Sequence, residues 1–243
     1  MASERELKRR PPDHGVGLEM VHAVIALGGG TPAGGDTQVL TSRYLDTRER
    51  ELELSQIGLR ARGNRDQTQA RWTVKIGATP DLRGISEAAE FEMDGCWQTL
   101  PPTLVVALRC VGVQGRLLEI ARFKTLRERW LVDLEGVELE VCLDSVTVDS
   151  PQAFSFVELE VEAPERGILD LVIDELERRF PSVGPSPQSK LATALMSVPR
   201  LRPAEGPIRA RAGDLGVRLG QLLDAVEEQP TPWASSTQGC QRC

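Results

Sequence analysis

Polar and mostly charged side chains recur at every second position in six stretches of the chain. Carboxylates bind hard divalent cations such as Mg²⁺ or Mn²⁺, whereas Lys and Arg bind phosphate oxygens. A ligand that needs both kinds of group is a metal-bound chain of phosphates. The six sets are Glu4, Glu6 and Lys8; Arg60 and Arg62; Thr73 and Lys75; Glu90 and Glu92; Glu138 and Glu140; and Glu158, Glu160 and Glu162.

A spacing of two places these side chains on one face of a β-strand, because successive side chains alternate. Apolar residues fill the opposite face, for example Leu59 and Ala61 beside the two arginines. Apart from the first stretch, whole strands are acidic or basic, and three carboxylates at alternate positions repel one another unless cations lie close by. Two interpretations have about equal weight at this point: a sheet with one wet face, or a tunnel with a charged interior.

The remaining pattern supplies the elements that would position these charges. About eight antiparallel strands favour closure into a barrel, which removes exposed edges. These elements predict an α+β, mainly β fold, whose tunnel form would be a closed eight-stranded antiparallel β-barrel with a charged interior and helices packed outside. Strands are predicted at 4–8, 39–44, 58–62, 71–76, 89–94, 126–133, 137–144 and 155–162. Helices are predicted at 18–27, at 103–111 with Thr103 as N-cap, and at 167–180.

Composition excludes some functions. The 243 residues contain 29 Lys and Arg against 36 Asp and Glu, a net charge of −7, which argues against contact with long nucleic acid. The chain contains no run of about 18 apolar residues, so no transmembrane helix is predicted. The N-terminus lacks the apolar region of a secretory signal. Three of the five cysteines lie in apolar stretches as buried thiols. These features predict a cytoplasmic protein.

The chain divides into two parts. We predict a domain over residues 1–198, followed over 199–243 by a Pro-rich linker, one amphipathic helix at 214–228 and a disordered tail. Cys240 and Cys243 form a single Cys-x-x-Cys in that tail, without the second pair of ligands that a zinc site needs.

An ordered set of motifs over residues 3–198 resembles the CYTH superfamily, the triphosphate tunnel metalloenzymes. The first motif is Glu4-x-Glu6-x-Lys8, which is similar to the Glu-x-Glu-x-Lys signature of that family. Each motif alone is weak, but their order is specific. The others are Tyr44-Leu45-Asp46-Thr47, Gly58 to Arg62, Trp72 to Lys75, Glu90-Phe91-Glu92, Thr125 to Trp130, Leu143 to Val146, Phe156 to Glu162 and Ser189-Lys190.

The resemblance implies an eight-stranded tunnel that binds and hydrolyses triphosphate groups with Mg²⁺ or Mn²⁺. The implied catalytic residues are Glu160, Lys75 and Arg62. Metal ligands are implied at Glu4, Glu6, Asp144, Glu158 and Glu160, with Glu140 and Glu162 as secondary candidates. Phosphate contacts are implied at Lys8, Arg60, Arg62, Lys75, Arg127, Arg129 and Lys190. Arg129 and Lys124 depend on the register around residues 122–130, because a bulge there would exchange the two faces.

The implied mechanism is attack by metal-activated water, with Arg and Lys stabilising charge on the transferred phosphoryl group. Glu160 could orient and deprotonate that water. No Ser–His or Cys–His arrangement suggests a covalent intermediate, since the only histidines are His14, in a predicted loop, and His22, a packing or surface residue of a helix.

Three departures from the family pattern bear on function. Ala88 stands where family members often have an Arg, which removes one phosphate contact. Arg9, Arg10 and the two prolines that follow end the first strand early. The helix at 214–228 resembles the opening of a CHAD domain, a helical module associated with polyphosphate; a shortened two-domain chain and an ordinary packing helix are equal alternatives.

Inorganic triphosphate is the favoured substrate, because the chain has only one Tyr, five Phe and four Trp with which to stack a base. The alternatives are a CYTH-type adenylate cyclase, a thiamine triphosphatase, or a polyphosphate-binding module without turnover. Joint presence of the carboxylates favours catalysis over binding alone. The expected partner is a small phosphate-chain compound, and no membrane contact is expected. The sequence leaves open whether the protein forms a homodimer.

Overall fold

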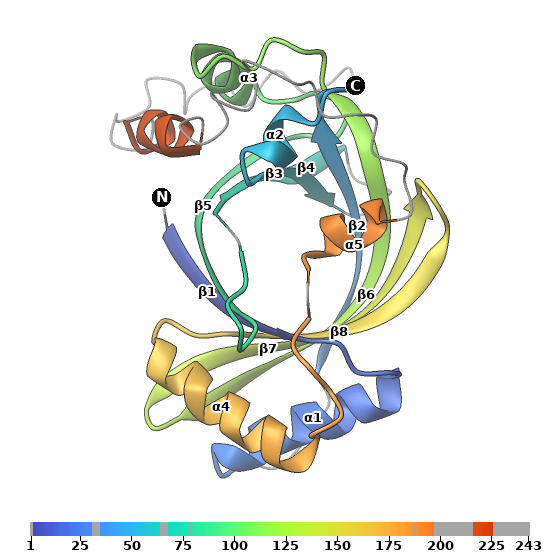
Figure 1. Cartoon of the computed structure of the whole chain (residues 1–243), viewed down its shortest axis with the longest axis vertical. Coiled ribbons are helices and arrows are strands. Elements are labelled where there is room, and N and C mark those ends of the chain that lie inside the picture. The colour runs from blue at the N-terminus through green and yellow to red at the C-terminus, as the bar shows by residue number, and fades with distance from the viewer. Residues whose placement is uncertain are drawn as a thin grey trace.

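The computed structural model describes residues 2–30, 35–63, 68–77, 79–186, 188–196 and 216–225, without the side chains of residues 2 and 3. Eight antiparallel strands close into a barrel in the order β1-β5-β4-β3-β2-β6-β7-β8, which confirms the predicted fold class (Figure 1). The strands are β1 (Ala2–Arg9), β2 (Asp36–Asp46), β3 (Ile57–Gly63), β4 (Gln69–Ile76), β5 (Ile85–Cys96), β6 (Leu118–Leu134), β7 (Val137–Ser150) and β8 (Phe154–Glu162).

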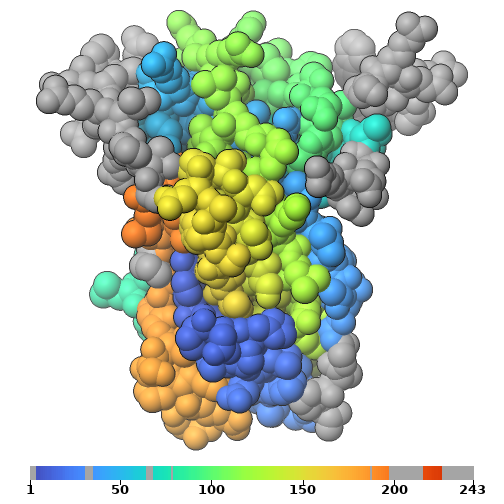
Figure 2. All heavy atoms as spheres, turned by 90° about the vertical axis from the view of Figure 1, so that its right-hand side faces the viewer, coloured from blue at the N-terminus to red at the C-terminus, as the bar shows by residue number. Residues whose placement is uncertain are grey.

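Helices pack on the outside of the barrel in two groups. α1 (His14–Leu27) and α4 (Arg166–Arg179) lie side by side across β1, β7 and β8. They bury one apolar core, and they form one end of the molecule in the side view (Figure 2). α2 (Glu51–Leu54), α3 (Pro102–Cys110) and a helical segment at 216–225 bury a second core over β3, β4 and β5. Burial of these outward apolar faces leaves the charged faces inside, as the alternation predicts.

Several boundaries differ from the sequence prediction. α1 begins at His14, not in a loop, because Asp13 caps it by accepting the backbone N–H of Val16 at 2.9 Å. α3 begins at Pro102, so Thr103 is not its N-cap; the proline lies in the first turn, where its missing N–H costs nothing. His22 is half-buried on α1. β6 is 17 residues long and starts eight positions before the predicted strand.

A short helix inside the barrel is the main feature absent from the prediction. α5 (Lys190–Leu195) begins after Ser189, whose hydroxyl caps it. Ala194 and Leu191 pack against Phe123, Val146 and Val148, which point inward because they alternate with outward residues of β6 and β7. The inner wall therefore changes from charged to apolar along these two strands, and α5 covers the apolar part (Figure 1).

The C-terminal segment is described only in part. Residues 216–225 are helical, and Leu219 and Leu223 are fully buried against the second outer core. The other residues of the predicted helix at 214–228, and both cysteines of the Cys-x-x-Cys pair, lie outside the described residues.

Candidate functional site

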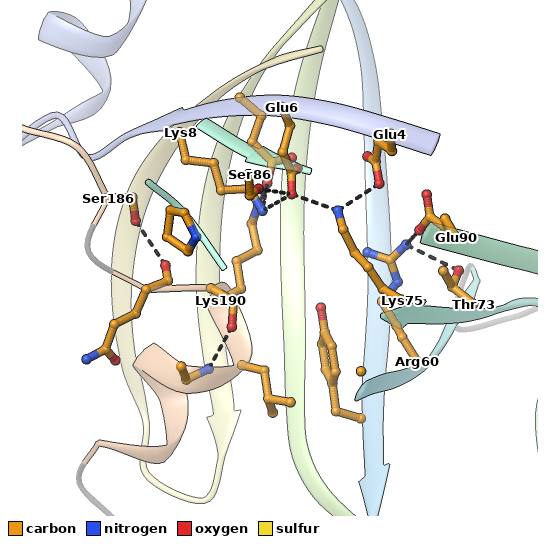
Figure 3. Close-up of a pocket in the computed structure, with 18 of the residues that line it drawn as sticks. Glu4, Glu6, Lys8, Arg60, Thr73, Lys75, Ser86, Glu90, Ser186 and Lys190 are labelled. Atoms are coloured by element: carbon orange, nitrogen blue, oxygen red, sulfur yellow. Dashed lines mark hydrogen bonds and ion pairs between the residues drawn. The ribbon is translucent and has the colours of Figure 1, made fainter. Parts of the chain in front are cut away.

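A cavity of about 460 Å³ lies inside the barrel, lined by the charged faces of the strands and by α5 (Figure 3). Acidic residues come from β1, β5, β7, β8 and α2, whereas basic residues come from β1, β3, β4, β6 and α5. The charged residues that line it are Glu4, Glu6, Lys8, Glu53, Arg60, Arg62, Lys75, Glu90, Glu92, Arg127, Glu140, Glu160, Glu162 and Lys190.

One group of carboxylates has the spacing of a cation site. Glu4, Glu6 and Glu162 each offer an oxygen within 4.8 Å of the others. Glu6 and Glu162 are direct partners across β1 and β8, and Glu4 follows on the same face. Hard divalent cations prefer carboxylate oxygens. Glu162, a secondary candidate from the sequence, therefore belongs with Glu4 and Glu6 to the acidic cluster whose spacing suits a cation.

The carboxylates of this cluster and of the neighbouring Glu90 lie close enough to repel one another, and this repulsion shifts their pKa values. Burial, together with the nearby Glu4 and Glu160 carboxylates, raises the pKa of Glu162 to about 8. Burial and the hydrogen-bonded Glu4 likewise raise the pKa of Glu90 to about 7. Burial also disfavours the charged form of Glu6, but Lys8 and Lys75 outweigh it and lower its pKa to about 2. A positive charge placed among these groups would relieve the repulsion.

Two lysines contact these carboxylates directly. Lys75 Nζ lies 2.7 Å from both Glu4 Oε2 and Glu6 Oε1, and Figure 3 shows it reaching between them. Lys8 Nζ lies 3.0 Å from Glu6 Oε1 and 3.2 Å from Glu160 Oε1. Lys75 stands on β4 and the glutamates on β1, which β5 separates, so closure of the barrel brings them together.

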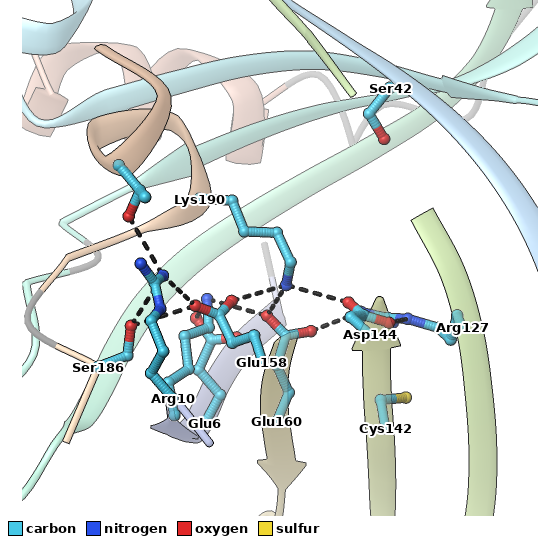
Figure 4. A network of polar contacts seen from close by, with 12 residues as sticks. Glu6, Arg10, Ser42, Arg127, Cys142, Asp144, Glu158, Glu160, Ser186 and Lys190 are labelled. Atoms are coloured by element: carbon cyan, nitrogen blue, oxygen red, sulfur yellow. Dashed lines mark hydrogen bonds and ion pairs between the residues drawn. The ribbon is translucent and has the colours of Figure 1, made fainter. Parts of the chain in front are cut away.

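A second carboxylate group, Asp144, Glu158 and Glu160, surrounds Lys190 (Figure 4). Lys190 Nζ lies 3.0 Å from Asp144, 2.8 Å from Glu158 and 2.5 Å from Glu160. Arg127 binds both oxygens of Asp144, at 2.8 and 2.7 Å, and reaches Glu160 at 2.5 Å. Although burial disfavours the charged form of Glu160, these cations hold its pKa well below the usual value. The group is already balanced by basic side chains.

The basic wall on β3 has fewer acidic partners. Arg60 lies 3.8 Å from Glu90 and 3.3 Å from the Thr73 hydroxyl. The one hydrogen bond of the Arg62 side chain within the described residues is to Ser42 Oγ, at 3.4 Å. Burial and the nearby Arg60 and Arg127 lower the pKa of Arg62 to about 10, because like charges disfavour its cationic form. An anion bound here would be stabilised.

The structure places the other predicted residues as follows. Arg129 pairs with Glu140 at 2.7 Å, is about one-third exposed and does not line the cavity. Lys124 is exposed and points outward, since it alternates with the inward Phe123 and Thr125. Ala88 is buried on the inner face, directly opposite Glu4.

Sequence reasoning gave no site role to several residues that the structure adds. Ser86 donates to Glu6 at 3.1 Å, Glu90 lines the cavity, and Arg10 and Ser186 contact Glu158. Alternation placed Glu90 on a charged face, and the same alternation on β5 could have found Ser86, which shares the inner face with Ala88. No period reveals Arg10, because it follows the end of β1.

Asp46, part of a family-like motif, has a structural role. Its carboxylate accepts backbone N–H bonds from Thr47, Leu52 and Glu53 at 2.7, 2.9 and 3.0 Å. It therefore satisfies the open donors at the start of α2 and does not belong to the cavity.

A family model described as the CYTH domain matches residues 4–195. One similar solved structure is a candidate adenylyl cyclase from Hippeastrum, described as having a dominant triphosphatase activity; it shares 20% identity and a TM-score of 0.53 over 78% of this chain and 94% of that one. Another is a candidate adenylate cyclase from Bacillus halodurans, with 18% identity and a TM-score of 0.54 over 79% and 98%. These likenesses show the fold.

A search of curated proteins found no match. Among the described helices, none has the length and apolar character needed to cross a membrane.

Proposed function

The chain belongs to the CYTH domain family, and from this premise we propose that it hydrolyses a triphosphate compound with the aid of Mg²⁺ or Mn²⁺. Inorganic triphosphate is the favoured substrate. The reaction would take place in the cavity inside the barrel, between the carboxylates of β1 and β8 and the arginines of β3.

The observation that carries this proposal is the spare positive charge of Arg62. Its pKa is lowered to about 10 by burial and by the nearby Arg60 and Arg127, and its hydrogen bond to Ser42 is long, at 3.4 Å. Arg binds phosphate oxygens through a planar fork of N–H donors. A phosphate chain would therefore satisfy the donors of Arg62 and relieve the repulsion among the three guanidinium groups.

The acidic cluster fits a divalent cation. Glu4, Glu6 and Glu162 present oxygens at a suitable spacing, and the raised pKa of Glu162, at about 8, marks a charge deficit that a cation would fill. A bound Mg²⁺ or Mn²⁺ would neutralise phosphate oxygens and lower the pKa of a water molecule. Glu4, Glu6 and Glu162 would hold it, with Asp144, Glu158 and Glu160 as the wider set of acidic residues.

The other residues would bind and orient the phosphate chain. Arg60 and Arg62 would hold phosphate oxygens on one side, and Lys8, Lys75 and Lys190 on the other. Glu160 has both oxygens engaged by Lys190 and Arg127 at 2.5 Å. Its lowered pKa makes it a weak base, so we assign it a positioning role toward the attacking water and the lysines.

Inorganic triphosphate is favoured over a nucleotide because aromatic surface is scarce in the cavity. Tyr44 is the one aromatic residue among the described residues that line it. Its ring packs edge-on against Phe123, with centroids 5.2 Å apart. Recognition of a nucleotide base would need aromatic surface for stacking and hydrogen-bond donors. The Tyr44 ring, already packed against Phe123, offers little such surface.

The test is phosphate release from inorganic triphosphate, ATP and thiamine triphosphate, with Mg²⁺, Mn²⁺ or EDTA. We expect metal-dependent release, fastest from inorganic triphosphate, and a fall of about 100-fold in kcat/KM for Arg62→Met, the order of effect seen when one preorganised charge-stabilising donor is removed. Arg122→Met is the matched control, because Arg122 is exposed and pairs with Glu119. Absence of release by the folded wild-type protein would refute the proposal.

A polyphosphate-binding module without turnover is the second candidate, and Ala88 favours it. Ala88 lies on the inner wall opposite Glu4, where an arginine would add a phosphate contact. Retention of long-chain polyphosphate without release of phosphate would select this alternative, whereas formation of cyclic AMP from ATP would select a cyclase.

A further inference from the structure

Arg10 links the end of β1 to the segment that carries α5. Its Nη2 lies 2.9 Å from Glu158 Oε1, 3.3 Å from Ser186 Oγ and 3.2 Å from Thr193 Oγ1 (Figure 4). The guanidinium also lies 4.3 Å from the centroid of the Phe156 ring, a cation–π contact. One side chain thus contacts β8, the segment before α5, and α5 itself.

α5 depends on such contacts for its place. It has six residues, and helices this short do not form in isolation. Apart from its Ser189 cap and the packing of Ala194 and Leu191, polar contacts fix one face of the helix. Lys190 and Thr193, three positions apart, lie on that face. Glu158 holds the first together with Asp144 and Glu160, and Arg10 holds the second.

Glu158 connects Arg10 to Lys190. Its Oε1 accepts from Arg10 at 2.9 Å, and its Oε2 lies 2.8 Å from Lys190 Nζ. The Glu158 side chain is fully buried, so loss of Arg10 would leave one oxygen of a buried carboxylate with only the Ser186 hydroxyl, 3.1 Å away. Glu158 would then draw more strongly on Lys190, since Arg10 would no longer balance its charge.

We propose that Arg10 is a positioning residue for the phosphate site: it fixes α5 and the Lys190 ammonium through Glu158 and Thr193, without touching the substrate. This inference rests on the proposed function, because it gives Lys190 a phosphate to bind. It also assigns a role to Arg10, a basic residue at the end of the first strand that the charged faces of the barrel leave unexplained.

A double-mutant cycle tests the connection to Lys190. We expect Arg10→Met to lower kcat/KM for inorganic triphosphate about ten- to 100-fold, chiefly by raising KM, because Lys190 would contact phosphate in the ground state as well as the transition state. In a Lys190→Met background the same substitution should cost less than about twofold. Arg10→Lys should recover part of the loss, since it keeps the charge.

Hydrogen exchange of the backbone amides of residues 190–196 provides a readout that is independent of activity. We expect these amides to exchange at least about tenfold faster in Arg10→Met, while the amides of α1 keep their wild-type rates, because only α5 loses an anchor. Arg122→Met is again the control, and its exchange should match the wild type throughout.

The outcomes separate this inference from the proposed function. If the wild type releases no phosphate, the proposed function fails, and exchange of α5 then decides the role of Arg10 alone. Unchanged exchange in Arg10→Met overturns the inference. So does an equal loss of kcat/KM in the wild-type and Lys190→Met backgrounds, because the effect would then not pass through Lys190.

Discussion

Arg127 and Asp144 form a buried two-bond ion pair between directly opposed residues of β6 and β7. Nε and Nη2 of the arginine lie 2.8 and 2.7 Å from the two carboxylate oxygens. Asp144 is fully buried and Arg127 is 7% exposed. Such a pair differs from Arg62, which has no carboxylate hydrogen-bond partner among the described residues. The two arginines should therefore differ in what their loss costs.

Removal of Arg127 should destabilise the fold. In Arg127→Met, Asp144 keeps Lys190 but loses its bidentate partner, and breaking a buried pair costs about 3–5 kcal/mol. Urea unfolding measures this change in the free energy of unfolding. Arg129→Met is the matched control on the same strand: its pair with Glu140 is partly exposed, so the cost should stay below about 1 kcal/mol. Equal costs for the two variants would contradict this assignment.

The stability of the metal-free protein should fall as pH rises from about 5 to about 8. Burial and the neighbouring carboxylates raise the pKa of Glu162 from 4.5 to about 8. Between these values the folded state binds more protons than the unfolded state, so the free energy of unfolding decreases with pH. Glu90, with a pKa of about 7, acts in the same direction. Glu6, lowered to about 2, contributes stability that is lost only below about pH 4.5.

Urea unfolding in EDTA at several pH values between 5 and 8 measures this trend. Glu162→Gln should flatten the decline, because the amide does not titrate. Glu87→Gln is the control, since Glu87 is exposed and pairs with Arg5 on the outside. Parallel curves for the wild type and Glu162→Gln would show that Glu162 is not the group responsible.

Divalent cation binding should depend more on Glu162 than on Glu158. Glu162 lies with Glu4 and Glu6 at the spacing of a cation site, whereas Glu158 is engaged by Arg10 and Lys190. We expect Glu162→Gln to weaken Mn²⁺ binding, followed by electron paramagnetic resonance, about tenfold or more, since charge count tunes the affinity of carboxylate sites. Glu158→Gln should change it less. The reverse order would favour the metal set implied by family resemblance over the one implied by geometry.

Local patterns were sufficient to predict the strands and their charged faces, whereas the choice of a closed barrel over a sheet with one wet face rested on the family resemblance. Alternation places Glu4, Glu6 and Lys8 on one face of β1 wherever the strand lies, because the side-chain period is fixed by the backbone. An amphipathic stripe located α4 because the helical period is fixed in the same way. The charged face had to point inward once helices covered the apolar one.

Contacts made by closure could not be predicted in this way. Lys75 meets Glu4 and Glu6 across β5, which separates β4 from β1, because the closed sheet curves and turns the inner faces of these strands toward each other. α5 has too few residues to show a period, and its place depends on Phe123 and Val146 inside the barrel. Arg10 lies beyond the end of β1, where alternation carries no information about direction.

Introduction of an arginine at position 88 should tighten phosphate binding. Ala88 lies on the inner face of β5, between Ser86 and Glu90 and opposite Glu4, so the longer side chain of Ala88→Arg would bring its guanidinium beside two carboxylates. Their charge would stabilise it, the pKa of Glu90 would fall from about 7, and the added donors would be available to phosphate. We expect KM for inorganic triphosphate to fall about three- to tenfold, a magnitude set by one charge-assisted hydrogen bond shared with neighbouring carboxylates. The matched control is Ala89→Arg, because Ala89 points to the outer face of β5. This variant should leave KM unchanged.

Circular dichroism would first establish that both variants are folded. An unchanged KM in folded Ala88→Arg would mean that the phosphate chain does not pass this part of the wall, and would place it closer to Arg60 and Arg62.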